Sequence, residues 1–124
     1  VGGHSFGELT ALYAAGAMDE TSLIKMARKR GELMNHASDK KGAMLAISQS
    51  SPDLIHHFKS VIIANYNSPE QLVLSGLEEE INQIQQQFIE QKIACQKLKV
   101  ATAFHSPLVA NSVGPFKKYL DGIK

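Results

Sequence analysis

The chain has 124 residues, of which 44% are hydrophobic and 20% charged, a composition typical of one folded domain. Its formal net charge of +1 gives no electrostatic reason to expect a nucleic acid or an acidic membrane surface as a partner. The single cysteine, Cys95, excludes an intramolecular disulfide framework and fits the reducing cytoplasm. No apolar stretch approaches the roughly 20 residues that are needed to span a bilayer, so no membrane role is expected.

The first residues place a serine between two glycines, in the pattern G-x-S-x-G from Gly3 to Gly7. This pattern is the signature of a nucleophile elbow, a sharp turn between a buried strand and a helix that exposes the serine hydroxyl. In that interpretation Ser5 is a nucleophile, and the backbone N–H of Phe6 stabilises the oxyanion. In the alternative interpretation Ser5 only caps a helix. Because only Val1 remains of the strand that an elbow requires, we expect the chain to be a segment of a longer protein.

Two helices are predicted in the first third of the chain. Residues 5–17 form the first, which ends near Gly16, and Asp19 caps a second that runs to about His36. The first has an apolar face that comprises Leu9, Leu12, Tyr13 and Gly16. Arg30 falls on the apolar stripe of the second helix, and a charge on an inward face needs a partner. That partner is either a carboxylate of the fold or the carboxylate of a substrate.

Residues 43–102 have a different pattern of apolar residues, which predicts strands and helices in the order β-α-β-β-α-β. This order is the ferredoxin-like arrangement. The predicted strands cover 43–47, 61–64, 71–75 and 98–102, with a turn over 67–70. A helix starts at Ser51-Pro52, with Leu54, Ile55 and Phe58 inward, and another covers 79–92, with Ile81, Ile84 and Phe88 inward. After 103–107 the tail is helical, and Gly114-Pro115 interrupts or restarts that helix.

A nucleophilic serine needs a base, and five histidines are present: His4, His36, His56, His57 and His105. His105 differs from the others because it follows a strand in a loop of small and apolar residues, where catalytic groups are commonly placed. No metal site is predicted, since Cys95 has no partner in a C-x-x-C pair and no H-E-x-x-H motif occurs.

Five motifs in order resemble those of the malonyl-CoA:acyl carrier protein acyltransferases, which include domains of polyketide and polyunsaturated fatty acid synthases. They are Gly3-His4-Ser5-Phe6-Gly7-Glu8, Arg30-Gly31 with Met34, Gly42-Ala43-Met44, Asn65 to Pro69 with Val73 and Gly76, and Ala103-Phe104-His105-Ser106. The resemblance implies an α/β fold in which residues 1–42 and 103–124 belong to an α/β-hydrolase-like large subdomain. Residues 43–102 are then an inserted ferredoxin-like (βαββαβ) small subdomain, and the N- and C-terminal parts of the full domain are missing.

The same resemblance implies roles for individual residues. Ser5 is the nucleophile, His105 the general base and acid, and Arg30 the group that binds the malonyl carboxylate. The segment around Phe104 is linked with extender choice and has the malonyl-like form. No cofactor is bound: malonyl-CoA is the substrate, and the acyl carrier protein brings its own phosphopantetheine. Other domains of a multidomain synthase are further expected partners. Asn111 stands where many members have proline, which we expect to affect the geometry of the tail.

Two other functions stay open at this point. An α/β-type serine hydrolase or thioesterase would use the same nucleophile, with an acidic residue such as Asp53 or Glu70 between serine and histidine in chain order. A non-catalytic module that docks a carrier protein would use Ser5 only as a structural cap.

Overall fold

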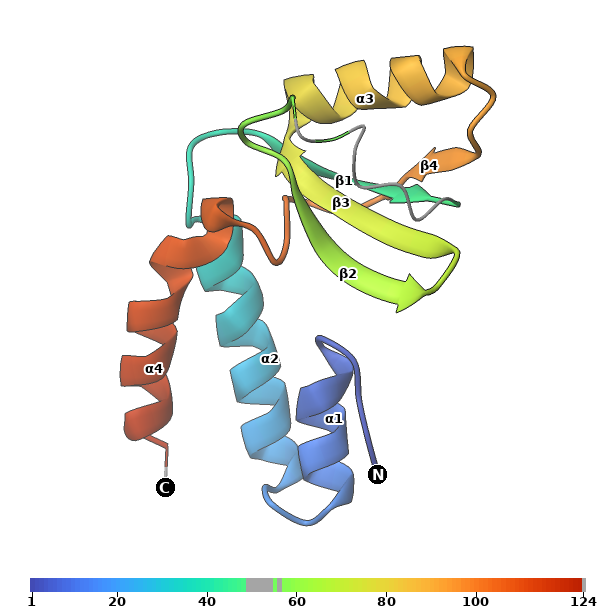
Figure 1. Cartoon of the computed structure of the whole chain (residues 1–124). Helices are drawn as coiled ribbons and strands as arrows, with labels where there is room; N and C mark the ends of the chain where they lie inside the picture. The colour runs from blue at the N-terminus through green and yellow to red at the C-terminus, as the bar shows by residue number, and fades with distance from the viewer. Residues whose placement is uncertain (49–54, 56, 124) are drawn as a thin grey trace.

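The computed structural model describes residues 1–48, 55 and 57–123, and in these residues the chain is an α/β protein with a small antiparallel sheet (Figure 1). The sheet carries helix α3 on one face, and helices α1, α2 and α4 lie side by side in a separate layer (Figure 1). The elements in chain order are α1 Gly7–Ala14, α2 Glu20–Asn35, β1 Gly42–Ile47, β2 Ile62–Ser68, β3 Gln71–Leu77, α3 Glu78–Glu90, β4 Cys95–Lys97, the 3-10 helix η2 Pro107–Ser112 and α4 Val113–Asp121.

The sheet has the strand order β2-β3-β1-β4, and every neighbouring pair is antiparallel. Side chains alternate between the two faces of a strand. On one face Leu45 of β1 lies opposite Leu74 of β3, and both are fully buried against α3. The inward residues of α3 are those predicted from its periodicity, Ile81, Ile84 and Phe88, and each is at most 1% exposed. This face of the sheet is therefore the hydrophobic core.

The start of α2 and the end of α1 follow the predicted chemistry. The Asp19 carboxylate accepts a hydrogen bond from the Ser22 N–H at 2.7 Å, which caps α2. At the end of α1, Gly16 has a φ of +76°, and Ala17 N–H donates to Leu12 C=O at 3.0 Å. This closure is a Schellman motif, and it ends α1 at Ala14 rather than at the predicted residue 17.

The prediction for the last strand is wrong in its position, because β4 covers Cys95–Lys97 and not residues 98–102. Helix α3 ends at Glu90, and Lys92 adopts a φ of +58°. The Ile93 N–H then donates to Phe88 C=O at 2.8 Å, so the chain reverses at once. Cys95 consequently pairs with Ile47, and the residues after Lys97 leave the sheet edge after one more bond, from Leu98 N–H to Met44 C=O.

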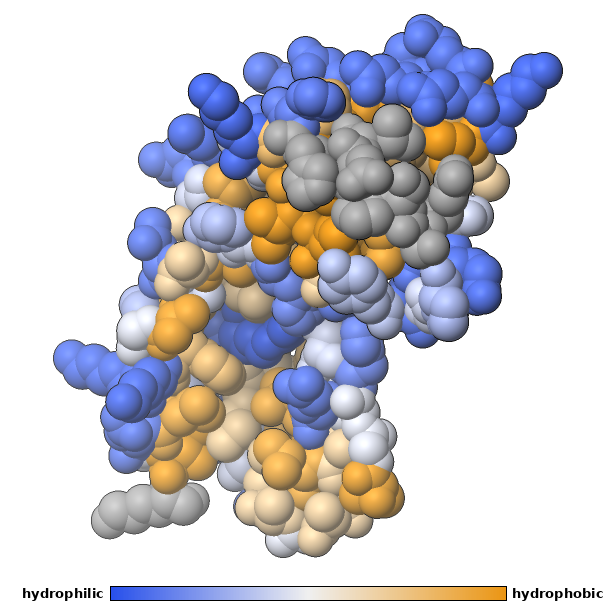
Figure 2. Space-filling model, viewed as in Figure 1, coloured by the Kyte–Doolittle hydropathy of each residue, from blue (hydrophilic) through white to orange (hydrophobic). Residues whose placement is uncertain are grey.

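The helical layer has little core of its own among the described residues. No residue of α1, α2 or α4 is buried, and Leu12 and Tyr13 stay 47% and 42% exposed. The apolar face predicted for the first helix is therefore not covered by the described residues. Figure 2 shows the contrast, with hydrophobic residues at the surface of this layer and hydrophilic residues along α3.

Two further predictions concern the connecting segments. The helix predicted to start at Ser51-Pro52, together with its inward residue Leu54, lies outside the described residues, although Ile55 is buried and Phe58 packs against the core. The tail restarts as predicted, since η2 gives way to α4 at Val113, just before Gly114-Pro115. Within the described part of the chain, no helix combines the length and the apolar character that crossing a membrane requires.

Candidate active site

Ser5 occupies a tight turn directly before α1. The Gly7 N–H donates to His4 C=O at 2.9 Å and the Glu8 N–H donates to Ser5 C=O at 3.1 Å. Ser5 itself has a φ of +53°, a left-handed conformation that costs energy in a residue with a side chain. The turn leaves no room at Gly3, where a Cβ atom would lie 2.0 Å from the Gly7 carbonyl oxygen. This is the geometry of a strained elbow. The turn requires a glycine at position 3, because any side chain there would collide with the backbone of Gly7.

The interpretation of Ser5 as a helix cap does not agree with this structure. The N-cap position of α1 is Phe6, and no side chain donates to or accepts from the first turn as a cap. The Ser5 hydroxyl instead lies 2.8 Å from Nε2 of His105, a residue 100 positions further along the chain. The hydroxyl is therefore turned toward an imidazole and not toward the N–H groups of its own helix.

His105 lies in the loop that connects the sheet to η2, and it too has a left-handed backbone, with a φ of +57°. Ser5, Lys92 and His105 are the three residues other than glycine with a positive φ in the described ranges 1–48, 55 and 57–123. Lys92 ends a helix, whereas the other two form the hydroxyl–imidazole pair. Backbone strain of this kind clusters at functional sites, because a strained conformation persists only where contacts with the surrounding structure hold it in place.

The pair has the arrangement of a nucleophile and its base. When the neutral imidazole carries its proton on Nδ1, Nε2 accepts the Ser5 proton at hydrogen-bond distance. Ser5 is half-buried and His105 is exposed, so a reactant can reach the hydroxyl. The Phe6 N–H, directly after Ser5, makes no hydrogen bond within residues 1–48, 55 and 57–123. It is thus free to donate to an oxyanion.

The other predicted site residues lie apart from this pair or beside it. Arg30 lines a cavity of about 310 Å³ between α2 and α4, and within the described ranges it makes no hydrogen bond to Ser5 or His105. Phe104 precedes His105 and is half-buried. Of the remaining histidines, His4, His36 and His57 are exposed, and His56 lies outside the described residues. The structure thus brings together two of the predicted residues, which were also the two farthest apart in the sequence.

One residue that holds the site was not singled out by its pattern. Ser75 of β3 is 0% exposed, and its hydroxyl donates to Phe104 C=O at 2.6 Å. A signal for it was present in the sequence, since Ser75 directly follows the apolar run Leu72-Val73-Leu74 in a buried strand. A hydroxyl in such a place must find a hydrogen-bond partner.

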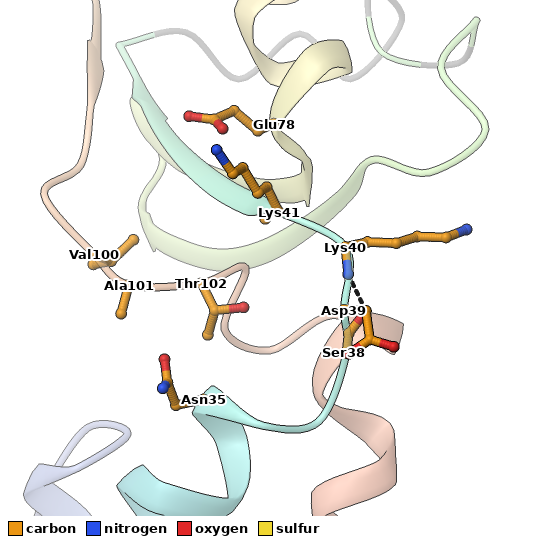
Figure 3. A pocket seen from close by; sticks show the side chains of 10 residues that line it. Asn35, Ser38, Asp39, Lys40, Lys41, Glu78, Val100, Ala101 and Thr102 are labelled. Atoms are coloured by element: carbon orange, nitrogen blue, oxygen red, sulfur yellow. Dashed lines mark hydrogen bonds between the residues drawn. The ribbon is translucent and has the colours of Figure 1, made fainter.

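A separate cavity of about 350 Å³ lies beside the sheet, between the loop after α2, the start of α3 and residues 100–102 (Figure 3). Lys41 extends toward Glu78 across this cavity, whereas Lys40 points away from it (Figure 3). The Lys97 ammonium donates to Glu78 at 2.9 Å and holds the pKa of that carboxyl below its ordinary value, with a smaller effect from Lys41. Neither Ser5 nor His105 lines this cavity, so it is distinct from the pair.

The structure thus combines an α/β fold with a serine and a histidine side chain at hydrogen-bond distance. The chain matches the family described as "Acyl transferase domain" over residues 1–118. The polyketide biosynthesis malonyl CoA-acyl carrier protein transacylase BaeC of Bacillus velezensis is 40% identical over 126 residues, which cover 97% of this chain and 44% of that protein. The chain belongs to the acyl transferase domain family.

Solved structures agree with this assignment. The malonyl CoA-acyl carrier protein transacylase of Burkholderia pseudomallei superimposes with a TM-score of 0.88 at 35% identity, over 98% of this chain and 43% of that one. The acyltransferase domain of the iterative polyketide synthase in enediyne biosynthesis gives a TM-score of 0.83 at 29% identity, over 98% and 33%. The chain thus spans less than half the length of these relatives.

Proposed function

We propose that the protein containing this chain transfers a malonyl group from coenzyme A to the phosphopantetheine thiol of an acyl carrier protein, in fatty acid or polyketide synthesis. The observation that carries the proposal is the 2.8 Å contact between Ser5 Oγ and His105 Nε2, made by two residues with strained backbones. Membership of the acyl transferase domain family and the similarity to named transacylases support acyl transfer as the reaction of this pair.

In the first half of the reaction His105 Nε2 takes the proton of the Ser5 hydroxyl as Oγ attacks the thioester carbonyl of malonyl-CoA. The Phe6 N–H donates to the oxyanion that forms on the former carbonyl oxygen. When the C–S bond breaks, His105 returns the proton to the sulfur, and free coenzyme A leaves. The product on the protein is a malonyl ester of Ser5.

The second half uses the same groups in the opposite direction. His105 takes the proton of the phosphopantetheine thiol, and the sulfur attacks the ester carbonyl, again opposite the Phe6 N–H. The bond to Ser5 Oγ breaks, and the proton on His105 returns to the serine. The carrier protein leaves with a malonyl thioester, so one Ser–His pair without a carboxylate partner completes both steps.

Specificity for malonate is assigned to Arg30 and to the Phe104 segment. A guanidinium binds a carboxylate with two parallel hydrogen bonds, and an acetyl ester has no free carboxylate to accept them. Arg30 lies on α2 with its guanidinium uncommitted to any ion pair within the residues described. We propose that it reaches the malonyl carboxylate in the intact domain, and that Phe104 shapes the neighbouring wall.

The chain is proposed to be part of a larger domain with two subdomains. Residues 1–42 and 103–124 form part of an α/β-hydrolase-like large subdomain, and residues 43–102 form a ferredoxin-like small subdomain. The strand order β2-β3-β1-β4 agrees with the second assignment. The exposed apolar side chains of the helical layer, such as Leu12, Tyr13 and Ile24, agree with the first, because further elements would cover them.

The direct test is intact-protein mass spectrometry of the full-length protein after mixing with malonyl-CoA. We expect one malonyl adduct on Ser5, none in Ser5→Ala, and acylation slowed by about 10²- to 10⁴-fold in His105→Ala. Arg30→Ala should lower the preference for malonyl-CoA over acetyl-CoA. Failure of the intact wild-type protein to form the adduct would disprove the proposal. Hydrolysis of the ester that outpaces transfer to the carrier protein would instead support a thioesterase.

The structure gives no support to the two alternative functions. For a hydrolase triad, Glu70 is the acidic candidate within the described residues, and it lies in the β2–β3 hairpin, where it bonds to Ser68 and not to His105. Asp53 lies outside the described residues. A docking module without catalysis does not account for the serine hydroxyl directed at an imidazole.

A further inference from the structure

Ser75 projects from the face of the sheet that lies opposite the hydrophobic core. Leu72 and Leu74 of β3 pack with α3, so the alternation of the strand sends Ser75 to the other side. There its hydroxyl donates to Phe104 C=O at 2.6 Å, although Ser75 and Phe104 are 29 residues apart. Ser75 is fully buried, so this hydroxyl has no water to replace the carbonyl.

The carbonyl that accepts this hydrogen bond belongs to the peptide that joins Phe104 to His105. His105 holds a φ of +57°, and a non-glycine residue keeps this conformation only where its neighbours fix it. The Ser106 hydroxyl fixes the loop from inside, because it donates to Ala103 C=O at 2.6 Å. Ser75 donates the hydrogen bond that comes from outside the loop, and this bond joins the loop to an inner strand of the sheet.

We propose that Ser75 is a positioning residue, which sets the His105 imidazole at hydrogen-bond distance from Ser5. The inference rests on the proposed function, in which His105 is the base. Ser75 touches no reacting atom in this role. It acts by holding the Phe104 carbonyl, and hence the backbone from which the imidazole projects, against the buried inner strand β3.

The variant Ser75→Ala removes one oxygen atom and preserves the packing of β3, but it leaves the Phe104 carbonyl without its donor. Misplacement of a catalytic group by about 1 Å costs on the order of 10²-fold in rate. We therefore expect Ser5 acylation by malonyl-CoA in the full-length protein to slow by roughly 10- to 100-fold. Calorimetric affinity for coenzyme A should stay the same, since Ser75 is fully buried and offers no surface to a ligand.

Ser112→Ala is the matched control. Ser112 is also a buried serine, with 7% exposure, and its hydroxyl also donates to a carbonyl at 2.6 Å, that of Val109 within η2. Its removal costs a comparable hydrogen bond without releasing the His105 peptide. A merely structural role for Ser75 predicts that both variants lose similar stability and keep similar acylation rates. The positioning role predicts that only Ser75→Ala acylates slowly.

Two readouts separate this inference from the proposed function. The rate of Ser5 labelling by a fluorophosphonate reports on the serine–histidine pair whichever acyl donor the protein prefers, and it should fall in Ser75→Ala and not in Ser112→Ala. A crystal structure of Ser75→Ala should show a displaced Phe104–His105 peptide. An unmoved peptide with the Ser5–His105 bond retained would overturn the inference, even if malonyl transfer is confirmed. A displaced peptide would support it, even if malonyl-CoA proves to be the wrong donor.

Discussion

Gly3→Ala is the substitution that most directly tests the elbow. The added Cβ atom would lie 2.0 Å from the Gly7 carbonyl oxygen, 2.2 Å from the Gly7 carbonyl carbon and 2.6 Å from the Glu8 nitrogen. These are all backbone atoms, so no side-chain rotation can relieve the contacts. Since Cβ contacts shorter than 3.0 Å are essentially never found, the two sides of the turn must separate by about 1 Å. Ser5 lies between them.

This displacement can be compared with the 2.8 Å bond between Ser5 and His105. A shift of about 1 Å removes the bond or misdirects it, so acylation should slow by about 10²-fold. Overpacking should also lower the free energy of unfolding by about 1–3 kcal/mol. The assay is the rate of malonyl-adduct formation in the full-length protein, measured by mass spectrometry beside a denaturant unfolding curve.

Gly2→Ala is the matched control, because a Cβ atom at Gly2 would have no neighbour within 4 Å. It changes the same residue type one position earlier and should acylate at the wild-type rate. If Gly3→Ala acylates as fast as Gly2→Ala, the elbow does not set the position of Ser5 and the reasoning is refuted. If both variants are equally slow, the effect belongs to the segment as a whole rather than to the contact at Gly3.

Three further predictions concern stability and reactivity. Phe88→Ala, at a position 1% exposed, should lower the free energy of unfolding by about 3–5 kcal/mol in denaturant titrations. The hydrogen bond from the Ser22 N–H holds the pKa of Asp19 below its ordinary value, so its stabilising effect is present above the unfolded-state pKa and is lost as the pH falls through the folded one. As the pH is lowered, the denaturant midpoint of unfolding should therefore fall less steeply in Asp19→Asn than in the wild-type protein. Burial raises the pKa of the Cys95 thiol, so iodoacetamide should alkylate it more slowly in the native protein than in the unfolded protein at mildly alkaline pH.

Elements that depend on neighbouring residues were predictable from the sequence. The Asp19 cap and the Gly16 helix end follow from local backbone chemistry, and the structure confirms both. The inward residues of α3 follow from a helical period that one sheet face can satisfy. In each case the interacting groups lie within a few turns of one another, so spacing alone determines their geometry.

The misplaced strand shows where spacing stops being sufficient. Leu98, Val100 and Thr102 alternate as a strand would, but the position of β4 is set by how soon the chain reverses after α3. Lys92 makes that reversal in a left-handed conformation that usually marks a glycine, so the sequence gives no warning of it. The pairing of Ser5 with His105 is similar, because no local rule joins residues 100 positions apart. Family resemblance, not periodicity, predicted that pair.

The two members of the pair depend on different parts of the molecule. His105 is tied by Ser75 to a sheet with a closely packed core, whereas Ser5 precedes a helix without a buried residue among those described. Their separation is therefore set by the contacts that join the two layers. The 3-10 helix η2 starts two residues after His105, and the Asn111 amide fastens it to the end of α2 by donating to Ala37 C=O at 3.1 Å. A proline at that position could not donate this bond. The bond between Asn111 and Ala37 thus joins the segment that follows His105 to α2, which packs against the helix that Ser5 precedes.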